Sequence, residues 1–188
     1  MKAALLCNGP SRAAYNPATP YDYRIGCNVP WTEVDSTVIV DYSIIFEWNK
    51  KRDLIKVPAY ISQRAYSEVP HCIRIPNEMP HRDFFRSNLI EIVHPLPEHD
   101  SSGHVACLVL MKKGFTEIDI YGCDSWFEQT TVSSTWDIII TPRNPNDIKK
   151  VKGWRDRWHT LMNKYPDSRV NFIDKNGISH AGQVENTL

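Results

Sequence analysis

The sequence predicts an α/β protein, a single Rossmann-like domain in which a mostly parallel sheet carries helices on both faces. Three observations support this class. Short β-prone segments alternate with helical or irregular segments, which is typical of β–α–β units. Several of these segments are apolar throughout, as strands covered on both faces are. They also end in small polar and turn-forming residues, as strands do at the ligand-binding edge of an open sheet.

The first strand is predicted over residues 2–7, where a short apolar run stops at Asn8-Gly9-Pro10-Ser11. These residues favour a tight turn, and Ser11 can cap a helix that follows it. The free N–H groups at a helix start favour phosphate. The turn is therefore a candidate nucleotide site, although good turn chemistry alone would give the same residues. It lacks the Gly-x-Gly-x-x-Gly spacing of a dinucleotide fingerprint.

The remaining elements follow in order along the chain. Strands are predicted at residues 22–27, 36–41, 54–61, 72–75, 89–93, 116–121, 136–141 and 169–173. One helix follows Ser101 and is capped by Gly114, and a second begins at Asn146 and ends before Pro166. We expect a loop or lid at 76–88, one domain over 1–173, and a loose polar tail over 174–188.

Composition limits the partners. The chain has 188 residues, with 22 Lys and Arg against 22 Asp and Glu, so no net charge attracts nucleic acid or an acidic membrane. The basic segment at 149–157 is better explained as a solvated helix face. The apolar run at the N-terminus is too short for a secretory signal, and no segment is apolar enough to span a bilayer. Five scattered cysteines indicate reduced core residues of a cytoplasmic protein, with neither a disulfide framework nor a metal site.

Three predicted strands end in similar polar residues, Asn8, Asn28 and Asp41. If the strands are parallel neighbours, these side chains converge at one edge of the sheet. Asn offers donors and acceptors to a base, a ribose or a phosphate, and Asp can bind ribose hydroxyls. The alternative is that Asn and Asp simply terminate strands.

A second phosphate-type helix start lies at Ser102 and Gly103, before a run that is apolar on all sides. His104 falls in the first turn of this helix, where the dipole would lower its pKa and keep it a neutral base. Asp124 follows the strand at 116–121 and is expected at the same edge. His104 and Asp124 are the candidate catalytic residues, with a structural histidine as the alternative for His104.

Four motifs stand in order along the chain: Leu6-Cys7-Asn8-Gly9-Pro10-Ser11, Cys27-Asn28, Ser101-Ser102-Gly103 and the stretch from Phe115 to Gly122-Cys123-Asp124. In this order they resemble the motifs of the bacterial sialyltransferases of glycosyltransferase family 42 and of related 6-hydroxymethylpterin diphosphokinase-like proteins. The match covers residues 1–30 and 100–126. The chain departs from the family where Ser125-Trp126-Phe127 replaces a tyrosine that assists phosphate departure.

The resemblance implies a Rossmann-type nucleotide site that takes a CMP-sugar donor without an obligatory metal, lined by Asn8, Asn28, Ser102 and Gly103. We therefore expect a nucleotide-dependent transferase, a small sialyltransferase-like glycosyltransferase. Diphosphate transfer from ATP is the first alternative, with Mg²⁺ held by Asp41 and Asp124. A non-catalytic nucleotide-binding module is the second.

Overall fold

The computed structural model describes residues 1–41, 56–62, 90–93, 101–128 and 148–182. Its strands form one sheet in the order β5-β4-β3-β2-β1-β6-β7-β8. They are β1 Lys2–Leu6, β2 Tyr23–Cys27, β3 Ser36–Ile39, β4 Ala59–Ser62, β5 Ile90–Val93, β6 Glu117–Tyr121, β7 Arg169–Ile173 and β8 Ser179–Ala181. Every neighbouring pair from β5 to β7 is parallel, and β8 joins β7 antiparallel. The predicted α/β class with a mostly parallel sheet is confirmed.

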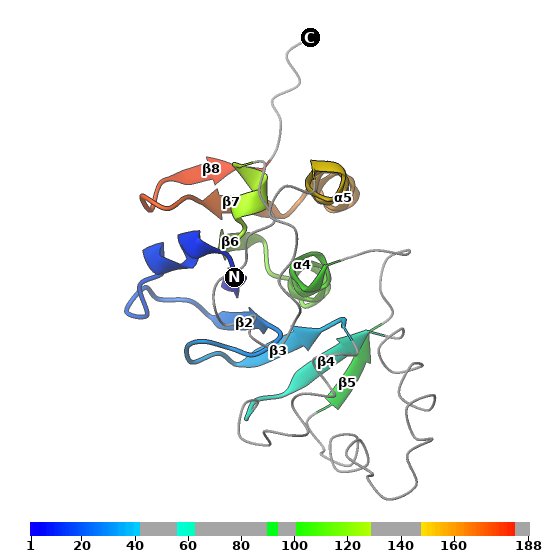
Figure 1. Ribbon diagram of the computed structural model, residues 1–188. Helices are drawn as coiled ribbons and strands as arrows, with labels where there is room; N and C mark the ends of the chain where they lie inside the picture. Colours follow the sequence, from blue (N-terminus) through cyan, green and yellow to red (C-terminus); the bar gives the residue numbers. More distant parts are fainter. Residues whose placement is uncertain (42–55, 63–89, 94–100, 129–147, 183–188) are drawn as a thin grey trace, which may run out of the picture.

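The described helices cover the sheet unevenly. The helices α4 (Ser102–Lys112) and α5 (Ile148–Lys164) lie on one side, and the 3₁₀ helix η1 (Pro10–Ala14) lies on the other (Figure 1). A second 3₁₀ turn, η2 (Asp124–Trp126), follows β6. The larger core cluster joins α4 and α5 to the sheet, and the smaller cluster contains aromatic residues beneath η1.

The first strand shows why the sheet needs cover on both sides. Ala3 and Leu5 of β1 belong to the core under α4, while Ala4 and Leu6 belong to the core under η1. All four side chains are buried. Because alternate residues of a strand face opposite sides, an uninterrupted apolar run is buried only when both faces are covered. β1 therefore occupies the centre of the sheet, between β2 and β6.

The unit formed by α4, a glycine turn and β6 agrees with the sequence prediction. Residues 102–111 of α4 are all buried, as expected for a helix that is apolar on all sides. Gly114 has a φ of 85°, the left-handed conformation that glycine adopts just after a helix end. Phe115 then packs into the core, and β6 begins two residues later.

Two predicted elements differ in the structure. β4 begins at Ala59, later than the predicted start at residue 54, because Pro58 has no N–H to donate within a ladder. The tail was predicted to be loose from residue 174, but Ser179–Ala181 forms β8 and pairs with β7. The predicted strands 72–75 and 136–141, the loop 76–88 and the helix start at 146–147 lie outside the described residues.

Candidate functional site

The first turn is fastened to the end of β6 by a carboxylate. Asp124 accepts hydrogen bonds from the Ser11 N–H at 3.1 Å and from the Ser11 hydroxyl at 2.9 Å. The Gly9 N–H also donates to the Gly122 carbonyl at 2.8 Å. A Cβ added to Gly9 would overlap the Asp124 carboxylate, and it would lie 2.5 Å from the Gly122 oxygen. Only glycine fits at this close approach.

These bonds correct one part of the sequence hypothesis. Ser11 was expected to cap a helix whose free N–H groups receive phosphate, but the element is the short 3₁₀ helix η1 and it has no side-chain cap. The Ser11 N–H already donates to Asp124. A carboxylate of the protein therefore occupies the position that was predicted for a phosphate.

The first turn is also joined to the end of β2. The Asn8 side-chain amide donates to the Cys27 carbonyl at 3.1 Å, which fixes the orientation of the amide group. Its other atom, Oδ1, is buried and accepts no hydrogen bond from the residues that the structure describes. A buried acceptor without a donor is rare in folded proteins, and a bound ligand is one way to satisfy it.

The end of β2 is in turn joined to the start of α4. The Ser102 hydroxyl donates to Asn28 Oδ1 at 3.0 Å, and both residues are buried. Asn28 has a φ of 59°, a left-handed conformation that Asn tolerates better than most residues. A Cβ on Gly103 would lie 3.2 Å from the Cys7 sulfur, so a small residue lets α4 begin close to β1.

His104 is placed at the start of α4, but its ring is turned into the protein. Nδ1 lies 2.8 Å from the Ser101 hydroxyl, and Nε2 lies 3.0 Å from the Trp154 carbonyl. A carbonyl can only accept, so Nε2 carries the proton and Nδ1 accepts from Ser101. Its pKa is lowered to about 4, mainly because the ring is buried. The predicted lowering is confirmed, although burial and not the helix dipole is the leading cause.

The geometry therefore links most of the predicted site residues. Asn8, Gly9, Ser11, Asn28, Ser102, Gly103 and Asp124 form a connected group at the carboxyl edge of the sheet, with Pro10 exposed in the first turn. Asp41 is half-buried and lies three residues after Val38, the register partner of Cys27. Register places it at the same edge, one strand further from Asn8.

Four cysteines lie close to this group. Cys7, Cys27, Cys107 and Cys123 are buried free thiols, as predicted, and the Cys7 and Cys27 sulfurs are 3.9 Å apart. Burial raises the pKa of Cys107 well above its ordinary range. The pKa of Cys7 is raised by its contact with Cys27 and by burial, although the Cys123 thiol opposes the shift. A thiol that resists ionisation is a poor nucleophile, so Cys7 and Cys107 serve packing.

Sequence reasoning missed two contributions to this edge. Trp31 donates its indole N–H to the Cys7 carbonyl at 3.2 Å, and the Arg12 guanidinium lies 5.1 Å from the centre of the Trp31 ring. The only signal for Trp31 was an aromatic residue soon after a strand end. Trp126 stacks on Phe172 with ring centres 4.1 Å apart. It is therefore part of the packing between η2 and β7.

A cavity of about 830 Å³ is lined by residues other than the predicted site residues. Its lining includes Arg24, Asp35 and Lys56, which stand at the amino ends of β2, β3 and β4. Arg24 donates from its side chain to the Tyr15 hydroxyl, and Asp35 accepts from the Arg24 backbone N–H. These polar groups hold the surrounding loops, and they lie at the opposite edge from Asn8.

Comparison with known proteins identifies the class of fold. No protein-family model matches the chain, and no curated protein matches its sequence. Among solved structures the chain is similar to the sialyltransferase CstII in complex with a trisaccharide acceptor and CMP. The TM-score is 0.53 and the identity 13%, over 95% of this chain and 83% of that one. CstII from Campylobacter jejuni with CMP-3FNeuAc gives a TM-score of 0.57 at 14% identity, over 94% and 81%.

At this level of identity the likeness concerns the fold. It supports the predicted α/β fold with a mostly parallel sheet, and it lends no support to the diphosphokinase alternative. No described helix is long and apolar enough to cross a membrane, and no three acidic, histidine or cysteine side chains of the described ranges are grouped to hold a metal ion.

Proposed function

We propose that this chain is a nucleotide-dependent transferase, a small sialyltransferase-like glycosyltransferase with a nucleotide-sugar donor. One observation carries the proposal. The ends of β1 and β2 and the start of α4 are joined through Asn8, Asn28 and Ser102 at one sheet edge. The fold is also similar over most of the chain to a sialyltransferase whose complex contains CMP.

The proposed nucleotide site is formed by the first turn from Asn8 to Ser11, together with Asn28, Asp41, Ser102 and Gly103. The buried Oδ1 of Asn8 has no donor among the described residues, and we propose that a ribose hydroxyl or a base amino group of the ligand supplies one. Gly103 keeps the start of α4 close to the first turn. CMP-sugar is the proposed donor because the structural neighbours contain CMP or a CMP-sugar analogue.

The two candidate catalytic residues fit positioning roles. Asp124 holds Ser11 and thereby the first turn, and His104 holds Ser101 and the start of α4. Catalysis would then come mainly from orienting the donor and from dipoles that stabilise the departing phosphate. We keep Asp124 and His104 in the proposed site as residues that shape it.

A thermal-shift screen with CMP, UMP, CMP-sialic acid, a UDP-sugar and ATP tests the proposal. A ligand at one hundred times its Kd stabilises the native state by about 2.7 kcal/mol, which raises the Tm of a chain of this size by roughly 5–10 °C. We expect this rise with CMP and CMP-sialic acid. If none of the five nucleotides raises the Tm, the proposal is wrong.

Chromatography of CMP-sialic acid incubated with the protein then separates an enzyme from a binding module. We expect release of CMP, faster when a trisaccharide acceptor is present. Tight binding with unchanged recovery of the donor would instead support the non-catalytic module.

A further inference from the structure

We infer that Arg12, stacked on Trp31, binds the phosphate group of the nucleotide ligand. The inference rests on the proposed function and adds to it a residue that distinguishes a nucleotide from its nucleoside. A nucleotide at this edge brings negative charge to a place where the protein has already placed a carboxylate.

The carboxylate in question is that of Asp124. It lies within hydrogen-bond distance of the Ser11 N–H and hydroxyl, at 2.9–3.1 Å. Two anions in this space would repel each other, so the backbone of the first turn is unsuited to receive the phosphate. A positively charged side chain beside the turn offsets this repulsion.

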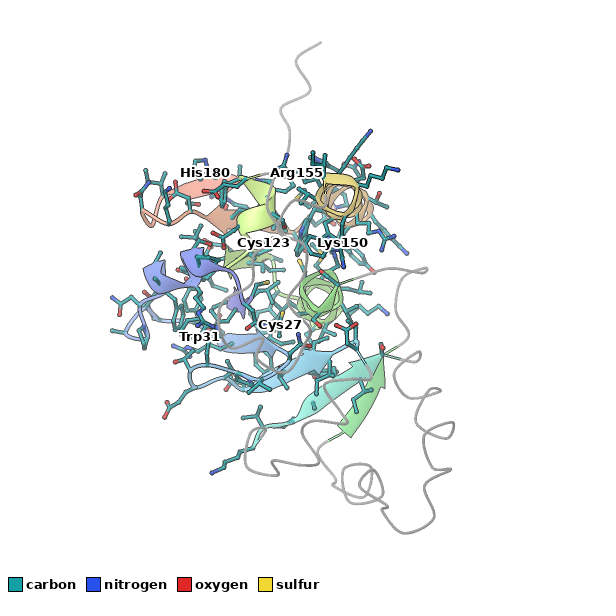
Figure 2. The ribbon with its side chains drawn as sticks, viewed as in Figure 1. Cys27, Trp31, Cys123, Lys150, Arg155 and His180 are labelled. Atoms are coloured by element: carbon teal, nitrogen blue, oxygen red, sulfur yellow. The ribbon has the colours of Figure 1, made fainter. Side chains whose placement is uncertain are left out.

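Arg12 is in the right place to supply that charge. It follows Ser11 in η1, and its guanidinium carbon is 5.1 Å from the centre of the Trp31 ring. Trp31 is itself fixed by the bond from its indole N–H to the carbonyl of Cys7, the residue before Asn8. Figure 2 shows Trp31 on the side of the sheet where η1 lies, with Cys27 between Trp31 and α4. The stacked pair thus lies beside the predicted nucleotide site.

Stacking also suits the chemistry of a guanidinium. The interaction with the indole uses the face of the planar group and consumes none of its N–H donors, which lie in the plane. Phosphate oxygens bind a guanidinium along that edge, often through two parallel hydrogen bonds. The Trp31 ring therefore fixes the orientation of Arg12 before a ligand arrives.

A second arginine near this edge has a structural role. Arg155 of α5 donates from Nε to the Ser125 carbonyl at 2.7 Å and from Nη2 to the Glu128 carbonyl at 2.9 Å. These bonds hold η2 and the residues after it against α5. The assignment of the phosphate to Arg12 follows from its position next to the first turn.

Calorimetric titration of CMP and of cytidine into three proteins tests the assignment: wild type, Arg12→Ala and Arg12→Lys. We expect Arg12→Ala to weaken CMP roughly 10- to 100-fold, the range for one charge-assisted contact. Cytidine, which lacks the phosphate, should bind the wild type and Arg12→Ala equally within about twofold. Arg12→Lys should bind CMP with intermediate affinity because it keeps the charge and loses the planar fork.

Arg169→Ala is the matched control, because Arg169 is exposed at the amino end of β7 and should leave both affinities unchanged. Circular dichroism and the Tm of each variant report its folding. Equal weakening of CMP and cytidine, or no weakening of either, would overturn the role of Arg12 while leaving the proposed function intact. A wild type that binds neither ligand would overturn both.

Discussion

The start of η1 and the start of α4 differ in the groups that accept hydrogen bonds from their backbone N–H groups. Each lies at the carboxyl edge of the sheet, and each has N–H groups that lack partners within the helix. At η1 the partner is Asp124, which is 113 residues away in the sequence. At α4 the partner is local, since the Ser101 N–H donates to Nδ1 of His104 at 3.3 Å, three residues further on. The start of η1 therefore depends on assembly of the sheet, and the start of α4 depends on burial of the His104 ring.

Gly9→Ala should have the largest effect on the free energy of unfolding. It disrupts the start of η1 and leaves the start of α4 unchanged. A methyl group at this position meets the Asp124 carboxylate and the Gly122 carbonyl, and backbone atoms cannot move aside as a flexible side chain can. We expect a loss of about 3 kcal/mol in the free energy of unfolding, measured by urea denaturation.

Gly153→Ala is the control for that variant. Gly153 is in α5, and an added Cβ there contacts nothing within 4 Å. Alanine should stabilise the helix by about 1 kcal/mol. Equal effects of the two substitutions would show that the close packing of the first turn does not matter.

The stability that the start of α4 contributes should depend on pH, because this start contains the buried His104 ring. The pKa of His104 is about 4 in the folded protein, against 6.5 for an exposed histidine. Below pH 6.5 the unfolded chain takes up a proton that the folded chain does not, so stability falls as the pH drops from 6.5 to 4 and the loss is complete near pH 4. This shift corresponds to about 3 kcal/mol.

Urea denaturation from pH 7 to pH 4 measures this dependence. His104→Gln should remove this part of the pH dependence, whereas His180→Gln, at an exposed position in β8, should retain it. A pH profile that is the same in His104→Gln and in the wild type would show that the buried ring does not set it.

A double-mutant cycle between Ser11→Ala and Asp124→Ala measures the interaction energy between these two side chains, which lie far apart in the sequence. The two side chains share a hydrogen bond of 2.9 Å to a charged acceptor that is half-buried. We expect a coupling energy of about 1.5 kcal/mol in the free energy of unfolding. A coupling near zero would mean that the two elements are held together by other contacts.

The smallest expected effect concerns Asn28. It accepts a hydrogen bond from Ser102 at the start of α4, and it follows Cys27, whose carbonyl accepts from Asn8 in the first turn. Asn28→Gly and Asn28→Ala both remove the acceptor for Ser102, so their difference reports only the backbone conformation. At a φ of 59° we expect the glycine variant to be more stable by about 1 kcal/mol in denaturation experiments. If the alanine variant were the more stable of the two, strain at this turn would be negligible.

The same contrast explains how much of the structure could be predicted from sequence. The run through β1 and the unit of α4, Gly114 and β6 were predictable because their signals are local: an apolar run, a capping position and a β-prone segment. β8 was missed because Ser179–Ala181 is short and exposed, and only its pairing with β7 makes it a strand.

The candidate site was predictable in its location and less so in its bonds. Strand ends bearing Asn8 and Asn28 pointed to one edge, and the structure joins them. The bond between Ser11 and Asp124 has no local signal, since it forms only when β1 and β6 become neighbours. The orientation of His104 toward Trp154 likewise depends on α5 packing against α4.

Titration of CMP into the wild type and into Asn8→Ala, followed by calorimetry, tests the central claim most directly. The claim is that the joined strand ends bind a nucleotide, with Asn8 Oδ1 as an acceptor for the ligand. We predict that the wild type binds CMP and that Asn8→Ala binds it roughly 10- to 100-fold more weakly with little loss of Tm. Asn163→Ala, at an exposed position of α5, should bind as the wild type does. Undiminished affinity of Asn8→Ala for CMP would contradict the account.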